Sequence, residues 1–283
     1  MIHKASPLDR LNRERPAIIA HRGASGHAPE NTLFAAKLAR EMGADMWELD
    51  AGLSKDGHLE VLHDDTLERT TNVARLPRFQ GREPYRLADF THEELRELDA
   101  RGTWRGPENQ ERPALERSED PDAPRFKIPS LKEALLLTKE LDWTVNIEIK
   151  DHADRSGHAQ VVRRALDLVR ETGMSGRALV SSFNHEYLGQ ARALMPELAL
   201  AVLVDTEFKG DVVAVCKECG ARFCHPQAEM CDKAFMNALR QAEIAVNVWT
   251  VNEPEAMRAF IAAGADGIIT NYPDRLSALL AGR

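Results

Sequence analysis

Features typical of several protein classes are absent from this sequence of 283 residues. It has no run of about 18 apolar residues, so we expect no stable membrane insertion. Residues 1–16 lack the apolar segment of a secretory signal, which favours a cytoplasmic protein. Basic residues are outnumbered, with 37 Lys and Arg against 45 Asp and Glu and a net charge of −8. We therefore expect no nucleic-acid partner, since such proteins normally carry a basic surface.

Cysteine is scarce, and its four positions all fall between residues 216 and 231. Cys216 and Cys219 form a C-x-x-C pair, and four thiolates could close a zinc site. The second pair, Cys224 and Cys231, has an irregular spacing for a zinc ribbon. We therefore favour buried free thiols in a reducing compartment over zinc, and zinc over a disulfide.

The residues that are present alternate between short apolar runs and helical patterns. Because the runs are rich in Val, Ile and Leu throughout, they are typical of strands covered on both faces. Eight such runs separated by helices predict a (β/α)8 TIM barrel, with a doubly wound open sheet as the alternative. The lack of a G-x-G-x-x-G motif after the first run disfavours a dinucleotide-binding version of that alternative. The predicted strands are 17–20, 46–53, 144–149, 178–182, 199–204, 221–224, 245–250 and 267–270.

One region interrupts this alternation. Residues 72–127 contain many prolines and no clear strand, so we predict a single domain, 1–283, with a small insertion after the second strand. Residues 107–124 are charged and predict a loop, whereas residues 87–101 predict one helix with Leu95 and Leu98 facing inward. We expect the insertion to pack on the barrel rather than to have an independent core.

Ionisable residues gather where the predicted strands end. Residues i and i+2 of a strand share a face, so Glu48 projects with Asp50, and Glu148 with Lys150. In a barrel these strands are neighbours, and three clustered carboxylates resist burial unless a cation neutralises them. Oxygen ligands predict one divalent cation, Mg²⁺ or Ca²⁺, with Mn²⁺ as a further candidate.

Two histidines and an arginine lie at other strand ends of the same barrel face. His21 and Arg22 follow the first strand, and His63 follows a short apolar run at 59–62. Arg and Lys side chains suit a phosphate, and paired histidines suit proton transfer at an attacking and a leaving oxygen. Together with a metal, this set predicts cleavage of a phosphoester.

Eleven short motifs follow one another along the chain. They are HRG at 21–23, PENT at 29–32, ELD at 48–50, DG at 56–57, HDDTLERTT at 63–71, IPSL at 128–131, NIEIK at 146–150, SSF at 181–183, HP at 225–226, WTVN at 249–252 and GIITNYP at 267–273. In their order and spacing, the sequence resembles the glycerophosphodiester phosphodiesterase family, of the bacterial cytosolic type. The resemblance covers nearly the whole chain except residues 1–15 and most of 73–127.

This resemblance implies the TIM barrel and the hydrolysis of a small-molecule glycerophosphodiester to glycerol 3-phosphate and an alcohol. It implies roles for nine residues, and it makes His21 the base and His63 the acid. The sequence gives no indication of oligomeric state. The implied metal ligands are Glu48, Asp50 and Glu148, the implied acid–base residues are His21 and His63, and the implied substrate-binding residues are Arg22, Lys150, Phe183 and Trp249.

Other interpretations stay open at this point. The apolar residues of the insertion could form a lid for lysophospholipids, although packing on the barrel is favoured. A barrel that has lost activity would lack a catalytic group, and here none is missing. Before the first helix, we expect Asn31 to act as its N-cap and Glu30 to hold the preceding loop. We also expect the glycines of the 23–26 loop to let the backbone approach a phosphate.

Overall fold

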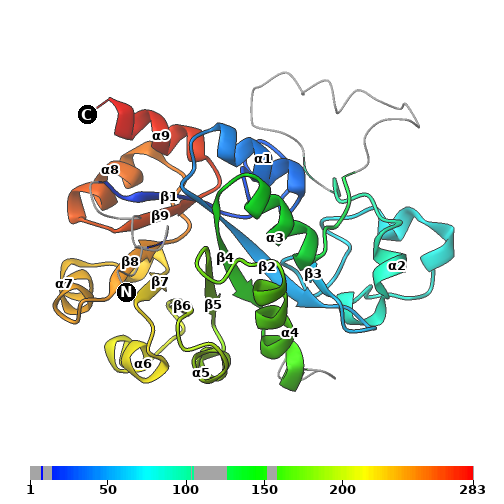
Figure 1. Ribbon diagram of the computed structural model, residues 1–283. Coiled ribbons are helices and arrows are strands. Elements are labelled where there is room, and N and C mark those ends of the chain that lie inside the picture. The colour runs from blue at the N-terminus through cyan, green and yellow to red at the C-terminus, as the bar shows by residue number, and fades with distance from the viewer. Residues whose placement is uncertain (1–7, 9–14, 103, 105–125, 152–157, 283) are drawn as a thin grey trace.

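The computed structural model describes residues 8, 15–102, 104, 126–151 and 158–282. Eight parallel strands form the centre, and β1 pairs with both β2 and β9, so the sheet closes on itself. This closure confirms the TIM barrel and excludes the open sheet (Figure 1). The barrel strands are β1 (Ala17–Ala20), β2 (Met46–Leu53), β4 (Thr144–Ile149), β5 (Ala178–Ser182), β6 (Ala199–Val204), β7 (Phe223–Pro226), β8 (Ala245–Val248) and β9 (Gly267–Thr270).

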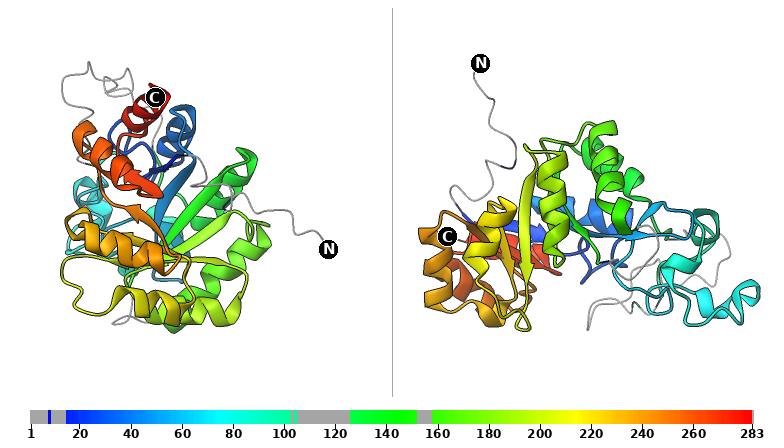
Figure 2. Two further views of the ribbon diagram at one scale, coloured as in Figure 1. Left: turned by 90° about the vertical axis from the view of Figure 1, so that its left-hand side faces the viewer. Right: turned by 90° about the horizontal axis from the view of Figure 1, so that it is seen from below.

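Helices surround the strands in all three views (Figures 1 and 2). They are α1 (Leu33–Glu41), α3 (Leu131–Glu140), α4 (His158–Glu171), α5 (His185–Leu194), α6 (Val212–Cys219), α7 (Lys233–Gln241), α8 (Pro254–Ala263) and α9 (Pro273–Ala281). The sequence patterns did not predict α6, because its valines favour strands. Its end signals are present nevertheless: the Asp211 side chain accepts a hydrogen bond from the Ala214 N–H, and Gly220 ends the helix in the left-handed conformation.

Side chains alternate between the two faces of each strand. Ile18 and Trp47 pack in the layer between strands and helices, whereas Ile19 and Met46 belong to a second cluster. Glu48 has the same parity as Met46 and follows it toward the carboxyl end of β2, as the period of two predicts. The strand pattern therefore determines which polar residues face the barrel axis.

Two predicted strand boundaries were wrong. β7 covers Phe223–Pro226 rather than 221–224, and β8 ends at Val248 rather than at residue 250. The polar His225 and the Pro226 ring interrupt the apolar run, but pairing with Leu203 and Val204 of β6 keeps both in the strand. His225 thereby becomes a fully buried strand residue.

The inserted segment begins after β3 (Leu59–Val61), which pairs antiparallel with β2. It contains the short 3₁₀ turns η2 (Val73–Arg75), η3 (Pro77–Phe79) and η4 (Leu87–Asp89), and the helix α2 (His92–Leu95). Leu95 and Leu98 are fully buried, as predicted, although the helix is only four residues long. The segment lies beside β3 on the outside of the barrel (Figures 1 and 2). The charged loop predicted at 107–124 lies outside the described residues.

Most residues of a second hydrophobic cluster, separate from that between the barrel strands and helices, come from the insertion, and the sequence did not predict this grouping. Phe79 and Phe90 meet edge to face at 5.2 Å and are fully buried. The apolar residues of this segment are far apart in sequence and connected by short turns, so no helical or strand period revealed them. The cluster consists of Leu62, Leu67, Val73, Phe79, Tyr85, Leu87, Phe90, Leu95, Leu98, Ala100, Phe126 and Ile128.

The cysteines are free thiols, as favoured. Cys216, Cys219 and Cys224 are buried and Cys231 is half-buried. Among the described residues, no cysteine belongs to a cluster that could hold a metal ion. None of the described helices is both long and apolar enough to cross a bilayer.

Candidate active site

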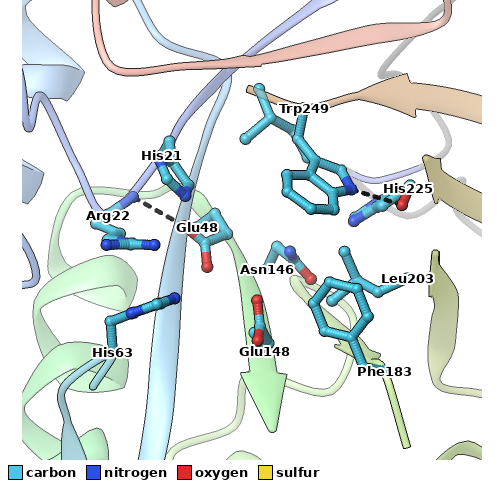
Figure 3. A pocket seen from close by; sticks show the side chains of 11 residues that line it. His21, Arg22, Glu48, His63, Asn146, Glu148, Phe183, Leu203, His225 and Trp249 are labelled. Carbon is cyan, nitrogen blue, oxygen red and sulfur yellow. Dashed lines mark hydrogen bonds between the residues drawn. The ribbon is translucent and has the colours of Figure 1, made fainter. Parts of the chain in front are cut away.

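A pocket of about 200 Å³ brings together residues that the sequence placed at strand ends (Figure 3). Charged groups and the two catalytic candidates occupy one side, and aromatic and apolar side chains face them from the other. The residues that line the pocket are His21, Arg22, Glu48, His63, Asn146, Glu148, Phe183, Leu203, His225, Trp249 and Ile269.

The three carboxylates predicted as metal ligands do meet. Asp50 of β2 is paired in register with Glu148 of β4, and Glu48 precedes Asp50 on the same strand face. One oxygen from each lies within 4.8 Å of the others. Glu48 Oε1 and Asp50 Oδ1 are buried and have no hydrogen-bond partner. Buried carboxylate oxygens without donors fit a hard divalent cation.

The protonation equilibria of these groups reflect their crowding. Burial and the carboxylates of Asp50 and Glu148 raise the pKa of Glu48 well above its usual value. Burial and Asp50 also raise the pKa of Glu148. For Asp50, burial acts in the same direction, but Lys150 and Arg22 outweigh it and lower the pKa to about 2. Protonation of these carboxylates and binding of a cation would therefore compete.

Lys150 lies directly against this cluster. Its Nζ is 2.7 Å from Glu148 Oε1 and 3.6 Å from Asp50 Oδ1. It does not line the pocket itself. The structure therefore places Lys150 beside two candidate metal ligands. To contact a phosphate in the pocket, its ammonium group would have to turn toward the pocket.

Arg22 joins the first loop to the carboxylates through both its backbone and its side chain. Its φ of 57° lies in the left-handed region, which is uncommon for a residue with a side chain. In this conformation its backbone N–H donates to Glu48 Oε2 at 2.8 Å. The guanidinium lies 2.9 Å from Glu30 Oε1 and 3.3 Å from Asp50 Oδ2. The strained backbone of Arg22 thus helps to orient the Glu48 carboxylate, a candidate metal ligand.

The neighbouring Gly23 is required by packing. It has a φ of 80°, and a Cβ at this position would lie 2.6 Å from the Ala35 carbonyl carbon of α1. A side chain here would separate the loop from the helix. The backbone conformation and the contact with α1 therefore explain the glycine at this position without the expected approach of the backbone to a phosphate.

Asn31 does not cap α1, so that expectation was wrong. Thr32 is the N-cap, and its side chain accepts from the Ala35 N–H. Asn31 Nδ2 instead donates to Asp50 Oδ2 at 2.8 Å, and the Asp50 N–H donates to Asn31 Oδ1 at 3.3 Å. The Asn31 side chain therefore bonds to β2 rather than to the start of α1. The residues around Asn31 in the sequence could not indicate a partner on another strand.

Glu30 contacts a second loop as well as its own. Both its oxygens accept from Arg69, at 2.8 and 2.7 Å. Arg69 also donates to both oxygens of Asp64, which lies 2.7 Å from His63 Nδ1. A continuous set of charged contacts therefore connects Arg22 to His63 through Glu30, Arg69 and Asp64. The sequence did not predict this role of Arg69, because its two partners come from separate loops.

His21 is held in one orientation. Its Nδ1 lies 2.7 Å from Asn271 Oδ1, which also accepts from the Ser25 hydroxyl at 3.0 Å. Because an amide oxygen only accepts, Nδ1 carries the hydrogen and Nε2 has a free lone pair. Burial, together with the positive charge of Arg22, lowers the pKa of His21 to about 4. His21 is therefore neutral at physiological pH.

His63 is held by a carboxylate rather than an amide. The Asp64 contact at Nδ1 leaves Nε2 toward the pocket, where the ring faces the carboxylates across from His21 (Figure 3). The two histidines thus differ in the group that orients the remote nitrogen, an amide oxygen for His21 and a carboxylate for His63.

The aromatic side of the pocket includes both predicted wall residues. Phe183 and Trp249 meet edge to face at 5.7 Å, and Phe183 remains 40% exposed. Trp249 Nε1 donates to the His225 carbonyl at 2.7 Å. This wall suits an uncharged, partly apolar part of a ligand.

Two lining residues, Asn146 and His225, were missed as site residues. Asn146 Oδ1 and His225 Nδ1 are buried without a partner. Burial lowers the pKa of His225 to about 3, and its Nε2 lies 3.0 Å from Asn247 Nδ2. The signal for Asn146 was its position two residues before Glu148, on the same strand face.

The chain is similar over most of its length to proteins of one family. The family model described as Glycerophosphoryl diester phosphodiesterase family matches residues 21–275. A glycerophosphodiester phosphodiesterase of Caldanaerobacter subterraneus is 34% identical over 262 residues, covering 92% of this chain and 95% of the relative. A protein of the same name from Bacillus altitudinis is also 34% identical over 262 residues, covering 91% and 95%.

Solved structures show the same similarity. A phosphodiesterase of Oleispira antarctica, determined in complex with the product sn-glycerol-3-phosphate, has a TM-score of 0.77 and 25% identity, covering 94% of this chain and 97% of the other. A glycerophosphodiester phosphodiesterase of Agrobacterium tumefaciens has a TM-score of 0.71 and 26% identity, covering 93% and 99%. The similarity therefore extends over the barrel and every strand that carries a pocket residue.

Proposed function

The chain belongs to the glycerophosphoryl diester phosphodiesterase family and is a hydrolase of glycerophosphodiesters, and from this premise we propose how its pocket performs the reaction. Glu48, Asp50 and Glu148 hold one divalent cation, and His21 and His63 transfer protons. The observation that carries this proposal is the meeting of three carboxylates with two oriented histidines around one pocket. Two of the carboxylates have a buried oxygen that accepts no hydrogen bond.

The carboxylate cluster suits Mg²⁺ or Ca²⁺, and Mn²⁺ as well, because all its ligand atoms are oxygens. When bound, such a cation would polarise a phosphoryl oxygen and offset negative charge in the transition state. Arg22 adds a fixed positive charge beside the cluster, and Lys150 adds a second. Both would favour the phosphate over an uncharged group.

His21 is the base in this proposal. Asn271 holds its hydrogen at Nδ1, so the free Nε2 can accept a proton from the glycerol hydroxyl next to the ester. That hydroxyl oxygen then attacks phosphorus. Attack from within the substrate removes the need to position a second molecule, which contributes several kcal/mol.

His63 is the acid. Asp64 supports the protonated imidazole, which gives its proton to the departing alcohol oxygen as the phosphorus–oxygen bond breaks. The products are a free alcohol and a cyclic phosphate. Water then opens the ring with the histidine roles exchanged, which yields glycerol 3-phosphate and returns both histidines to their starting protonation states.

The pocket also supports recognition of the glycerol end. Asn146 Oδ1 is a buried acceptor without a donor, and His225 Nδ1 is a buried N–H without an acceptor, because the Nε2 of that ring accepts from Asn247 Nδ2. Glycerol hydroxyls, which both donate and accept, would satisfy them. Phe183 and Trp249 would cover its carbon atoms. The pocket has a charged side and an aromatic side. This division would suit glycerol 3-phosphate, the product bound in the Oleispira antarctica structure.

A lysophospholipid lid is less well supported. Of the apolar insertion residues, Phe79, Tyr85, Leu87 and Phe90 are buried in the insertion's own cluster, and Leu76 packs against it. They are thus not available to cover an acyl chain. We propose diesters without acyl chains as the substrates.

Substrate comparison tests this proposal. We expect release of glycerol 3-phosphate from glycerophosphocholine and glycerophosphoethanolamine with Mg²⁺ or Ca²⁺ present, and slower turnover of lysophosphatidylcholine. The His21→Ala variant is the matched blank for contaminating hydrolases. Faster turnover of the lysophospholipid would reverse the substrate assignment, and equal turnover by the variant would remove His21 from the reaction.

A further inference from the structure

A second set of potential metal ligands lies outside the pocket. His58 precedes β3, Glu60 is within it, and His92 is the first residue of α2. One ligand atom from each lies within 4.8 Å of the others. None of the three lines the catalytic pocket. The group therefore joins the barrel's antiparallel strand to the inserted segment, independently of the phosphodiesterase chemistry.

Glu60 is the unusual member of this group. Its side chain is 0% exposed, yet it is a carboxylate on a strand. Oε1 lies 2.7 Å from His92 Nδ1, but Oε2 is buried with no hydrogen-bond partner. A simple ion pair with His92 therefore accounts for only one of the two oxygens. A buried carboxylate oxygen without a donor is costly unless a cation occupies its open side.

The two imidazoles are arranged on one side of this carboxylate. The His58 and His92 rings stack at 4.8 Å with an angle of 21°. His58 is exposed and His92 half-buried, so the site is open to solvent and an ion could enter. A pocket of about 550 Å³ adjoins both histidines.

The backbone holds these ligands in place. The His92 N–H donates to Asp56 Oδ1 at 3.0 Å, and Thr91 and Glu94 form a capping box at the start of α2. Glu60 is paired with Gly52 of β2 on one side and forms a bridge with Ser130 on the other. Ligands on fixed backbone lose little freedom when an ion binds.

The charged side chains of the adjoining pocket are compatible with a bound cation. Lys132 lies 3.7 Å from Glu171 Oε2, and Arg164 donates to the Gly57 carbonyl and to Gln160. Both basic side chains in this lining thus have partners other than Glu60. Asp167 contributes a further negative charge to the same lining.

We propose that His58, Glu60 and His92 bind one divalent transition-metal ion of the zinc class. Two imidazole nitrogens and one carboxylate oxygen are the donors, and solvent supplies the remaining position. Nitrogen ligands distinguish this site from the oxygen-only cluster, because imidazole suits zinc whereas carboxylates alone suit Mg²⁺ and Ca²⁺. The ion would connect β3 to α2 and so stabilise the inserted segment against the barrel.

Zinc titration by calorimetry in excess Mg²⁺ tests this site, since Mg²⁺ fills oxygen sites and leaves imidazoles free. We expect one Zn²⁺ per chain and a higher melting temperature with zinc. His58→Gln, His92→Gln and Glu60→Gln should each weaken binding by more than about 10-fold, since even outer partners of a metal contribute that much. Glu171→Gln, a change in the same pocket wall, should bind zinc like the unaltered protein.

The exposed His58 makes its variant the safest test, because its substitution removes no buried contact. Unchanged zinc affinity in folded His58→Gln and His92→Gln would overturn the proposal, as would the absence of any zinc binding in excess Mg²⁺. Turnover of glycerophosphocholine with Mg²⁺ should remain unchanged in all four variants and so reports their folding.

Discussion

Each of the two pocket histidines has its remote nitrogen tied to a partner, and the partners differ in charge. Asn271 faces His21 Nδ1 with a neutral oxygen, whereas Asp64 faces His63 Nδ1 with a carboxylate. The amide oxygen holds His21 with Nε2 unprotonated, as the proposed base requires, and the carboxylate orients His63 for the proposed acid role.

Removing the carboxylate from His63 should impair proton donation specifically. We expect Asp64→Asn to lower kcat on glycerophosphocholine by about 10- to 100-fold, the range typical of outer partners of a functional histidine. A nitrophenyl diester needs no proton on its leaving group, so its turnover should fall much less. Steady-state kinetics on both substrates measure the difference, with Glu68→Gln as the control for loss of a nearby exposed carboxylate. Equal losses on both would contradict the acid role.

Protons and the cation should compete for the carboxylate cluster. Glu48 and Glu148 have raised pKa values without a cation, so they hold protons at a higher pH than usual and release them when a cation binds. Binding therefore weakens as pH falls. His21 has a pKa of about 4, so its own protonation sets in at lower pH. We expect the acid limb of turnover to move to lower pH when Mg²⁺ is raised, as a pH profile at two concentrations would show. A limb independent of Mg²⁺ would contradict this.

The sequence allowed the site residues on strands to be predicted, but not the partners that orient them. Glu48, Asp50 and Glu148 could be placed because the period of two and the neighbouring strands determine their positions. Asn271 and His21 are 250 residues apart, and Arg69 contacts two different loops. Such contacts depend on closure of the whole barrel, which no local pattern describes.

Among the elements, the hydrophobic cluster of the insertion includes residues next to the proposed acid His63. Leu62 and Leu67 belong to the cluster around Phe79 and Phe90, and they flank His63 and Asp64 in the chain. The loop that carries the proposed acid is therefore anchored in this cluster as well as in the barrel, where the Leu62 N–H donates to the Asp50 carbonyl at 3.0 Å. Strand periodicity predicted the barrel, whereas this anchoring followed from scattered apolar residues and short turns and was missed.

Truncation of a buried aromatic in this cluster should disturb the loop that carries His63. Phe90 is fully buried, with the Arg82 guanidinium 3.8 Å from its ring centre. We expect Phe90→Ala to cost about 3–5 kcal/mol locally, as for other buried Phe residues. Amide exchange should then increase in the insertion and at residues 62–67, while the barrel strands stay protected and kcat falls. Leu136→Ala, at a side chain that is 47% exposed on α3, is the control. Uniform loss of protection would contradict an independent cluster.

At the scale of the molecule, the closed barrel turns distant segments into one pocket. β1 pairs with β2 and β9, so His21, Glu48 and Asn271 become neighbours although they come from both ends of the chain. The large exposed apolar side chains of the described residues are Phe34, Leu136 and Phe183, and they lie on separate elements.

The proposed reaction requires a cation at Glu48, Asp50 and Glu148. Release of glycerol 3-phosphate from glycerophosphocholine should be measured after EDTA treatment, with Mg²⁺, Ca²⁺ or Mn²⁺ restored one at a time. We predict that EDTA abolishes release, that at least one of these ions restores it, and that Glu148→Gln loses nearly all turnover at every ion concentration while remaining folded. Full release after EDTA, or near-normal turnover by the variant, would show that hydrolysis does not depend on a cation at these carboxylates.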